Sequence, residues 1–347
     1  MLPEPPPAAL RLEIDKEALA ANWRALDAMS GAARAGAAVK ADAYGVGAPI
    51  AVPVLRDAGC RDFFIAHWSE CRDFAGLVAP EAVSVLHGPA TPADAAFAKA
   101  TGLRPVINTI RQARNWLDAG GGPCDLMVDT GMNRLGVPMS QIGDESIGAL
   151  QVDVLMSHLA SADEDVPLND LQRDRWNAVR ALITHRRASL ANSAGIALGA
   201  PFHGDLTRPG ISLYGGIQRT QHRDVISQVV RPAAVVLQVR EIEAGESVGY
   251  NATFVAQHPM RIGTIALGYA DGYLRCWSGK GLMLRGERRL PVLGRISMDM
   301  TAIDLTCAPE IREGDWVSVQ YSLPEAAESS GLSQYELLTL LGSRFAR

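Results

Sequence analysis

The sequence predicts an α/β protein, a (β/α)8 TIM-type barrel followed by a mainly β C-terminal domain, and two observations carry this prediction. Short apolar runs alternate with helical stretches over about the first 220 residues, at a spacing of mostly about 20–35 residues, the length of a βα unit. Beyond Arg231 the chain changes to short strand-like runs separated by Gly, Pro and Asp turns.

Eight apolar runs are predicted as barrel strands, and they begin near Ala37, Phe63, Val83, Arg104, Asp125, Asp153, Ala188 and Asp205. Most are separated by a helical stretch, predicted over residues 49–58, 70–78, 92–100, 110–119 and 170–185. Before them, a strand over residues 10–14 precedes Asp15, which caps a predicted helix over 16–28. A doubly wound sheet is the main alternative, but no GxGxxG segment follows the first strand.

The second domain is predicted from the loss of helical stretches after the barrel. Strand-like runs cover residues 233–242, 261–267, 282–284, 290–292, 302–305 and 316–319, and a helix is predicted only over 334–341. We therefore place the barrel at residues 8–228 and the C-terminal domain at 229–347. The strand at about residues 9–14 is a candidate to join the C-terminal domain.

The composition is that of a globular protein with ample core, since 48% of the 347 residues are hydrophobic and 20% are charged. A formal net charge of −5, without long runs of like charge, argues against nucleic acid or an anionic membrane surface as the main partner. The five cysteines are scattered and no metal-ligand spacing is present, so we expect reduced thiols and no metal site. Without a signal-peptide pattern or a run of about 18 apolar residues, we expect a soluble cytoplasmic protein.

Polar side chains follow most of the predicted strands, at the end where a barrel carries its active site. Taken singly, each is more often a structural or surface group, but together they favour one active site. These residues are Lys40, Tyr44, His87, Asn108, Arg134, His158, Asn192, Ser193 and Arg208.

A phosphate site is expected after the seventh and eighth strands, where Ser193, Gly210 and Ile211 offer a hydroxyl and exposed backbone amides. A single lysine, Lys40, lies across the predicted barrel mouth from this phosphate site. Together they indicate a phosphorylated aldehyde held on the lysine as a Schiff base, and therefore pyridoxal 5′-phosphate as the cofactor.

The same segments resemble those of alanine racemases, in order and over nearly the whole chain. In the barrel the resemblance covers residues 38–45 (AVKADAYG), 128–136 (VDTGMNRLG), 157–160 (SHLA), 191–193 (ANS) and 208–215 (RPGISLYG). In the C-terminal domain it covers residues 248–253 (VGYNAT), 267–273 (LGYADGY) and 294–299 (GRISMD).

The resemblance implies a pyridoxal-phosphate-dependent isomerase that interconverts L-alanine and D-alanine, of which D-alanine is a peptidoglycan precursor. It also implies a head-to-tail homodimer with shared active sites. Lys40 resembles the lysine that binds the cofactor, and Tyr250 the second base, which reaches the cofactor of the other subunit. Racemisation removes the α-proton from one face of a planar carbanion and returns a proton to the other, so it needs two acid–base groups on opposite sides.

Further roles follow from the same resemblance. Arg208 corresponds to the partner of the pyridine nitrogen, and His158 with Arg208 forms a relay that tunes the two bases. The phosphate-binding set is Tyr44, Ser193, Gly210 and Ile211. The substrate-binding set is Arg134, Met298, Asp299 and Tyr269. Of these, Tyr269 corresponds to a residue of the substrate entry, where it narrows the pocket so that a substrate with a methyl side chain is favoured.

Two departures from the family pattern leave alternatives open. Met127 stands where many members carry a lysine, often carbamylated, so a bound chloride or another carboxylate is expected beside Arg134. Ser343 stands where many members have a tyrosine near the phosphate, which leaves a broader racemase for serine or basic amino acids as an alternative. A basic-amino-acid decarboxylase and a non-catalytic pyridoxal phosphate-binding protein are the less favoured alternatives. A third and milder departure from the family pattern is Ser297, which stands in place of a common cysteine.

Overall fold

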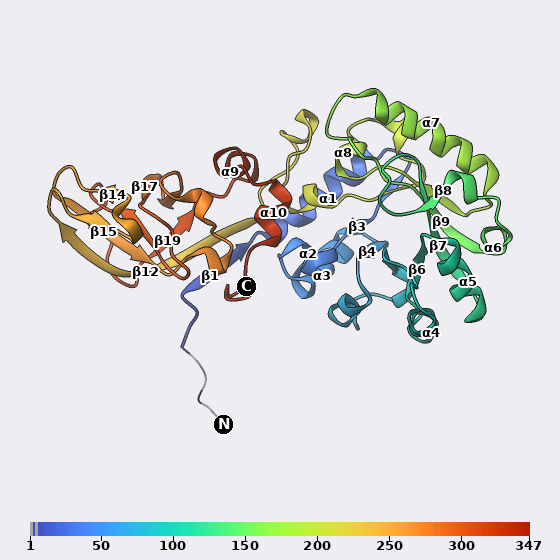
Figure 1. The fold of residues 1–347 in the computed structure, drawn as a ribbon, viewed down its shortest axis with the longest axis horizontal. Helices are drawn as coiled ribbons and strands as arrows, with labels where there is room; N and C mark the ends of the chain where they lie inside the picture. Colours follow the sequence, from blue (N-terminus) through green and yellow to red (C-terminus); the bar gives the residue numbers. More distant parts are fainter. Residues whose placement is uncertain (1–2, 4–5) are drawn as a thin grey trace. The chain divides into compact units, whose positions relative to one another are not determined.

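The computed structural model describes residue 3 and residues 6–347, and they form two compact units (Figure 1). One unit is Lys16–Ser227, and the other is Gln228–Arg347 together with the residues up to Asp15. Each unit is described by itself below.

The unit Lys16–Ser227 is a barrel of parallel strands with helices on its outside (Figure 1). Its strands are β3 (Ala37–Ala38), β4 (Phe63–Ile65), β5 (Val83–Val85), β6 (Arg104–Ile107), β7 (Pro123–Asp129), β9 (Gln151–Met156), β10 (Arg187–Ser189) and β11 (Leu206–Thr207). The strand β11 pairs with β2 (Arg34–Ala35), and the bonds from Gly36 N to Thr207 O and from Arg208 N to Ala191 O close the ring. The predicted barrel is confirmed.

The long helices of the barrel fall close to their predicted positions, because each begins at a helix-start signal. They are α1 (Lys16–Met29), α3 (Ala48–Ala58), α4 (Pro92–Thr101), α5 (Ile110–Asp118) and α7 (Pro167–Leu182), with short α2 (Lys40–Tyr44), α6 (Glu145–Gly148) and α8 (Ser193–Ile196). The helix predicted over 70–78 is wrong. A 3₁₀ helix, Trp68–Phe74, is present instead, and Gly76, at φ 77°, prevents any continuation.

A network of buried charges lies at the N-terminal ends of the barrel strands, away from the strand ends that carry the predicted site. Arg187 donates to both carboxylate oxygens of Asp62, at 2.9 and 2.7 Å, and to Asp153 at 2.9 Å. Arg104 lies 3.5 Å from fully buried Asp125. Because buried charges are tolerated only when paired, this network belongs to the barrel's stability.

The second unit is built on an antiparallel sheet in the order β1-β12-β15-β18-β17-β16-β19, in which β12 also pairs with β19. The strands are β1 (Leu10–Ile14), β12 (Val230–Ile242), β15 (Met260–Ile265), β16 (Leu282–Arg285), β17 (Arg288–Leu293), β18 (Thr301–Asp304) and β19 (Trp316–Val319). A short hairpin, β13 (Ser247–Val248) and β14 (Phe254–Val255), and helices α9 (Leu323–Ser330) and α10 (Gln334–Thr339) complete it. The helix α9 was not predicted.

The strand β1 pairs with β12 in antiparallel register, with Leu12 opposite Pro232. On its other side Leu12 N donates to Ala346 O at 2.8 Å, and Ala346 N donates to Leu10 O at 3.0 Å. The strand β1 therefore lies between β12 and the backbone of Ala346.

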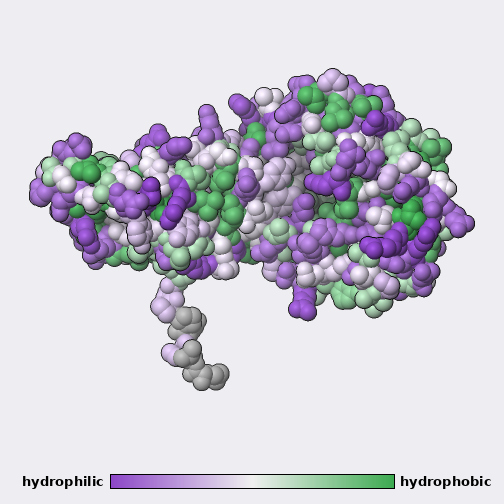
Figure 2. All heavy atoms as spheres, in the orientation of Figure 1, coloured by the Kyte–Doolittle hydropathy of each residue, from purple (hydrophilic) through white to green (hydrophobic). Residues whose placement is uncertain are grey.

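Polar residues cover much of the face seen in Figure 2, and apolar residues are scattered among them in small groups. Within the described residues, no helix has the length and apolar character needed to cross a membrane. The same residues hold no group of three or more His, Cys, Asp or Glu side chains able to bind a metal ion.

Candidate active site

Lys40 follows β3 after one residue, Val39, at the C-terminal end of the barrel strands. Its side chain is partly buried, and among the described residues no hydrogen bond or salt bridge involves its ammonium group. Burial lowers the pKa of Lys40, the positive charge of Arg134 lowers it further, and Glu70 raises it. A lowered pKa increases the fraction of neutral amine, which is the form that attacks an aldehyde or accepts a proton.

The four residues after Lys40 form one left-handed turn, with φ of 53°, 52°, 53° and 57° for Ala41, Asp42, Ala43 and Tyr44. For residues other than glycine this conformation costs about 1–2 kcal/mol each. The turn is held by tertiary contacts, since Ala41 N donates to Glu70 Oε1 at 2.7 Å and Ala48 N donates to Asp42 Oδ1 at 2.7 Å. Strain maintained in this way is typical of functional sites.

A cradle of hydroxyl and amide groups lies where the phosphate site was predicted. Ser193 Oγ accepts hydrogen bonds from Gly210 N at 2.9 Å and from Ser212 N at 3.3 Å. A Cβ atom on Gly210 would lie 2.3 Å from the Tyr44 hydroxyl oxygen, so only glycine lets the two meet. Ser212 Oγ is buried without a hydrogen-bond partner in the described part of the chain, and Ile211 between them is buried.

Ser212 was not among the predicted site residues, although it lies inside the segment 208–215. A buried hydroxyl without a partner is unfavourable unless a ligand or water satisfies it. Together with Tyr44, Ser193 and the backbone of Gly210, it forms a polar cradle that fits a phosphate group.

Arg208 is buried, and its guanidinium group donates to the Ser189 hydroxyl and to the Ser157 carbonyl oxygen. Burial lowers the pKa of Arg208 to about 10, so the group remains positive at neutral pH. Burial, followed by the charges of Arg208, Arg134 and Lys40, lowers the pKa of His158 to about 3. The imidazole is therefore neutral beside a fixed cation, and His158 lies within electrostatic range of Arg208, Arg134 and Lys40.

Arg134 lies in the loop after β7 and is exposed. Asp129 Oδ1 shapes this loop by accepting from Gly131 N at 2.8 Å and Met132 N at 2.9 Å. No hydrogen bond or salt bridge of the Arg134 side chain is present among the described residues. Met127, on β7, is buried and apolar, so it offers no charge to Arg134.

The remaining predicted residues lie in the β unit. Tyr250, 65% exposed, is between β13 and β14, and a Cβ atom on the preceding Gly249 would lie 3.6 Å from Arg295 O. Met298 O accepts from Ala270 N at 3.0 Å, beside Tyr269. The segments carrying Tyr250, Tyr269 and Met298 are thus neighbours in this unit.

A charged group accompanies these segments. Arg344 donates to Asp299 at 2.7 Å and lies 2.7 Å from Asp271. The guanidinium group of Arg275 lies 5.1 Å from the centre of the Tyr269 ring. Ser343, next to Arg344, is exposed.

Two of the polar residues singled out in the sequence serve the fold. The Asn108 amide donates to Leu86 O and Val106 O, both at 3.0 Å, and so is occupied by backbone. Asn192 Oδ1 accepts from Gly195 N at 2.9 Å and caps α8. His87 packs edge-on against His67, with ring centres 4.1 Å apart, beside Glu70 and Lys40.

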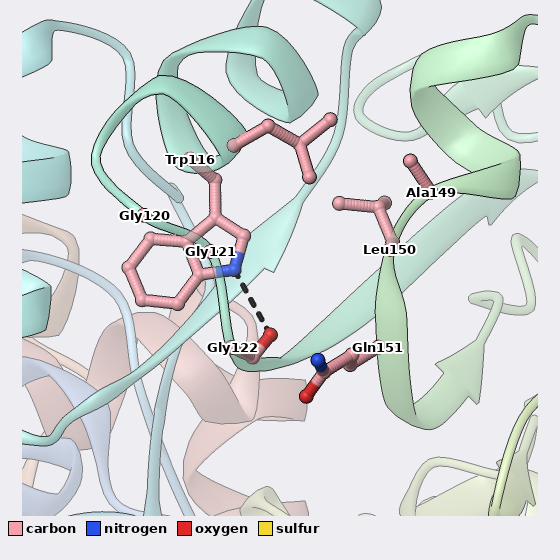
Figure 3. A pocket seen from close by; sticks show the side chains of 8 residues that line it. Trp116, Gly120, Gly121, Gly122, Ala149, Leu150 and Gln151 are labelled. Atoms are coloured by element: carbon pink, nitrogen blue, oxygen red, sulfur yellow. Dashed lines mark hydrogen bonds between the residues drawn. The ribbon is translucent and has the colours of Figure 1, made fainter.

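A cavity of about 250 Å³ lies elsewhere, among Trp116, Gly120, Gly122, Leu150 and Gln151 (Figure 3). There the Trp116 Nε1 group donates to Gly122 O at 3.2 Å. These residues lie before β7 and at or just before the start of β9, so the cavity is at the opposite end of the strands from Lys40. It contains none of the predicted site residues.

The chain is similar to known proteins over nearly its whole length. Residues 14–218 match the family model of the alanine racemase N-terminal domain, and residues 229–347 match that of the C-terminal domain. The alanine racemase of Methylobacterium nodulans is 43% identical, covering 97% of this chain and 95% of that protein. That of Acidiphilium cryptum is 39% identical, covering 97% of each.

Solved structures are similar over the same extent. The alanine racemase of Bartonella henselae, with covalently bound pyridoxal phosphate, has a TM-score of 0.90 and 34% identity, covering 98% of this chain and 99% of that one. The biosynthetic alanine racemase of Pseudomonas aeruginosa has a TM-score of 0.88 and 33% identity, with the same coverage.

Proposed function

The chain belongs to the alanine racemase family, and on that basis we propose that it is a pyridoxal 5′-phosphate-dependent isomerase that interconverts L-alanine and D-alanine. The observation that carries this proposal is the match to both family domains, in order and over nearly the full length. The barrel supports it by placing Lys40 after β3 and a hydroxyl and amide cradle around Ser193 and Gly210.

The residues present fit the cofactor at both its ends. Lys40 is the group that would bind the aldehyde, while Tyr44, Ser193, Gly210 and Ile211 would hold the phosphate. The buried Ser212 hydroxyl and the space kept free by Gly210 are the two observations that support this fit. When bound, the cofactor withdraws electrons from Cα of the amino acid and makes its α-proton acidic.

Lys40 and Tyr250 are proposed as the two catalytic bases. Burial favours the neutral Lys40 amine, which is ready to accept a proton at Nζ. Arg208 would face the cofactor's ring nitrogen, where it would donate a hydrogen bond without giving up its proton. Neutral His158 lies beside Arg208 and adds no further positive charge to the site.

The substrate is proposed to be a small amino acid whose carboxylate meets Arg134, with Met298, Asp299 and Tyr269 completing the substrate site. Tyr250 is 65% exposed in the unit that does not contain Lys40. We infer a homodimer in which Tyr250 of one subunit serves the site of the other. We further propose a cytoplasmic enzyme whose D-alanine is a peptidoglycan precursor.

The proposal is tested by incubating the holoenzyme with L-alanine in deuterated water and following both α-hydrogen exchange and D-alanine formation. We expect both to occur, together with the absorbance of bound cofactor. Exchange without D-alanine would contradict racemisation. The second candidate, a broader racemase favoured by exposed Ser343, is tested by the same assay with serine, lysine and arginine.

A further inference from the structure

Glu70 links the end of β4 to the turn that carries Lys40 and Tyr44. Its Oε1 accepts a hydrogen bond from Ala41 N at 2.7 Å. Its Oε2 accepts from Ala66 N at 2.7 Å and from His67 N at 3.2 Å. One carboxylate thus joins the backbone that follows two neighbouring strands of the barrel, β3 and β4.

The turn beyond Ala41 is one that its own sequence does not favour. Ala41, Asp42, Ala43 and Tyr44 all have positive φ, and no glycine occurs among them. A conformation of this kind persists only where surrounding groups hold it. The Ala41 N–H is the first donor of the turn, and a charge-assisted hydrogen bond to a carboxylate is among the strongest available to it.

The bond to Ala41 also fixes the peptide group between Lys40 and Ala41. This peptide sets the direction in which the Lys40 side chain leaves the backbone. Tyr44 is the last residue of the turn, so the conformation of the turn fixes its position, and its hydroxyl lies close to Gly210 in the phosphate cradle. The carboxylate also acts on Lys40 as a nearby negative charge, opposing the effects of burial and Arg134.

We propose that Glu70 is a positioning residue for the cofactor site: by holding the left-handed turn, it keeps Lys40 and Tyr44 placed to engage the aldehyde and the phosphate at the same time. This inference rests on the proposed function, because it assumes that pyridoxal phosphate is the ligand. Glu70 itself makes no contact with the reacting atoms. Its effect is on how well the two ends of the cofactor bind together.

The test compares two ligands in the cofactor-free protein, pyridoxal 5′-phosphate and pyridoxal, which lacks the phosphate. In Glu70→Gln the amide nitrogen cannot accept a hydrogen bond, so one side of the link is lost. We expect the ratio of the two affinities to fall by about fivefold or more, because the phosphate no longer binds in register with the lysine. Exposed Glu81 provides the matched control variant, Glu81→Gln, which leaves the ratio unchanged.

A second variant tests the mechanism. Ala41→Gly places glycine where φ is 53°, a conformation that glycine adopts readily, at an exposed position where little packing is lost. In the Glu70→Gln background we expect Ala41→Gly to restore part of the lost ratio. A general loss of stability would weaken both ligands equally and would leave the ratio of their affinities unchanged.

The inference is overturned if the ratio in folded Glu70→Gln stays within about twofold of the unaltered protein. If that variant does not fold, the same ratio and the same criterion apply to Glu70→Asp, whose shorter carboxylate keeps the charge but cannot reach both strand ends. Failure of the proposed function would appear separately, as no saturable binding of pyridoxal phosphate or no racemisation by the unaltered protein.

Discussion

The ring of Tyr44 stacks on the ring of Tyr214, with centres 4.9 Å apart and planes inclined by 27°. Tyr214 is fully buried, and its hydroxyl donates to Ala38 O at 3.0 Å. The same buried residue therefore contacts the strand before Lys40 and the tyrosine after it. This makes Tyr214 a buried support for the left-handed turn.

Two substitutions of Tyr214 should distinguish the contribution of ring stacking to cofactor binding from that of the hydroxyl hydrogen bond. We expect Tyr214→Leu to weaken pyridoxal phosphate binding about 3–10-fold, since an aromatic pair contributes about 0.5–1.5 kcal/mol beyond its buried area. Tyr214→Phe, the matched control, keeps the stack and should stay closer to the unaltered protein. Titration of the cofactor-free protein measures both, and equal effects of Leu and Phe would contradict a role for stacking.

Gly210 should not tolerate a methyl group. In Gly210→Ala the added Cβ would lie 2.3 Å from the Tyr44 hydroxyl oxygen, which is a severe overlap. We expect the displaced tyrosine to lower cofactor affinity by about tenfold or more. Gly143→Ala is the control, because nothing lies within 4 Å of the added atom there. An unchanged dissociation constant in Gly210→Ala would show that Tyr44 does not hold the phosphate.

The two proposed bases should fail in different ways. We expect Lys40→Ala to lose the cofactor on dialysis and to be inactive. Tyr250→Phe should keep the cofactor while racemisation falls by about 10²–10⁴-fold, most strongly from L- to D-alanine. Exposed Tyr335 supplies the control variant, Tyr335→Phe. Normal turnover by Tyr250→Phe would refute the two-base assignment.

Coexpression of Lys40→Ala with Tyr250→Phe tests whether sites are shared between subunits. In a mixed dimer with shared sites, one site carries both changes and the other carries neither. Random pairing would then restore about one quarter of full activity. If each site lay within one chain, every site would be defective and the mixture would stay inactive.

The sequence predicted the barrel closely because buried parallel strands are short continuous apolar runs, and those near Phe63 and Val83 begin where the structure has them. It did not predict the left-handed turn, since Ala-Asp-Ala-Tyr contains no glycine and only its aspartate tolerates positive φ. That conformation comes from Glu70 and Tyr214, which are distant in sequence. Ser212 was missed for a similar reason, because only the structure shows that its hydroxyl is buried without a partner among the described residues.

His222 should make the protein sensitive to acid. It is fully buried with both ring nitrogens unpaired among the described residues, and burial, followed by the charge of Arg219, lowers its pKa to about 4. Its contribution to stability is therefore complete above about pH 6.5, the ordinary pKa of histidine, and is lost as the pH falls toward 4. At pH 5 the loss is about 2 kcal/mol.

We expect the melting temperature of His222→Leu to fall less between pH 7.5 and pH 5 than that of the unaltered protein, as measured by thermal unfolding at the two pH values. Exposed His258 gives the control, His258→Leu, which should keep the original pH dependence. A drop in His222→Leu as large as in the unaltered protein would exclude this histidine as the cause.

Substrate binding at Arg134 should depend on an anion from solution, because Met127 is apolar and no protein carboxylate pairs with Arg134 among the described residues. We expect the KM for L-alanine to rise in chloride-free buffer of equal ionic strength, with little change in kcat. Met127→Lys, assayed with bicarbonate so that the lysine can carry an anionic carbamate, should reduce this dependence. Equal KM values with and without chloride, or a chloride-free crystal with Arg134 against a protein carboxylate, would exclude the anion.

The pairing of β1 with β12 has a consequence for synthesis on the ribosome. The partner of Leu10 in β12 is Ala234, which is translated more than 200 residues later, about 10–40 s at ordinary elongation rates. The barrel can form in that interval, while β1 lacks its partner strand and has unpaired backbone groups along its edge. Arg11 and Glu13 are exposed and alternate with the buried Leu10 and Leu12, so this unpaired edge carries charge, which disfavours its pairing with other nascent chains.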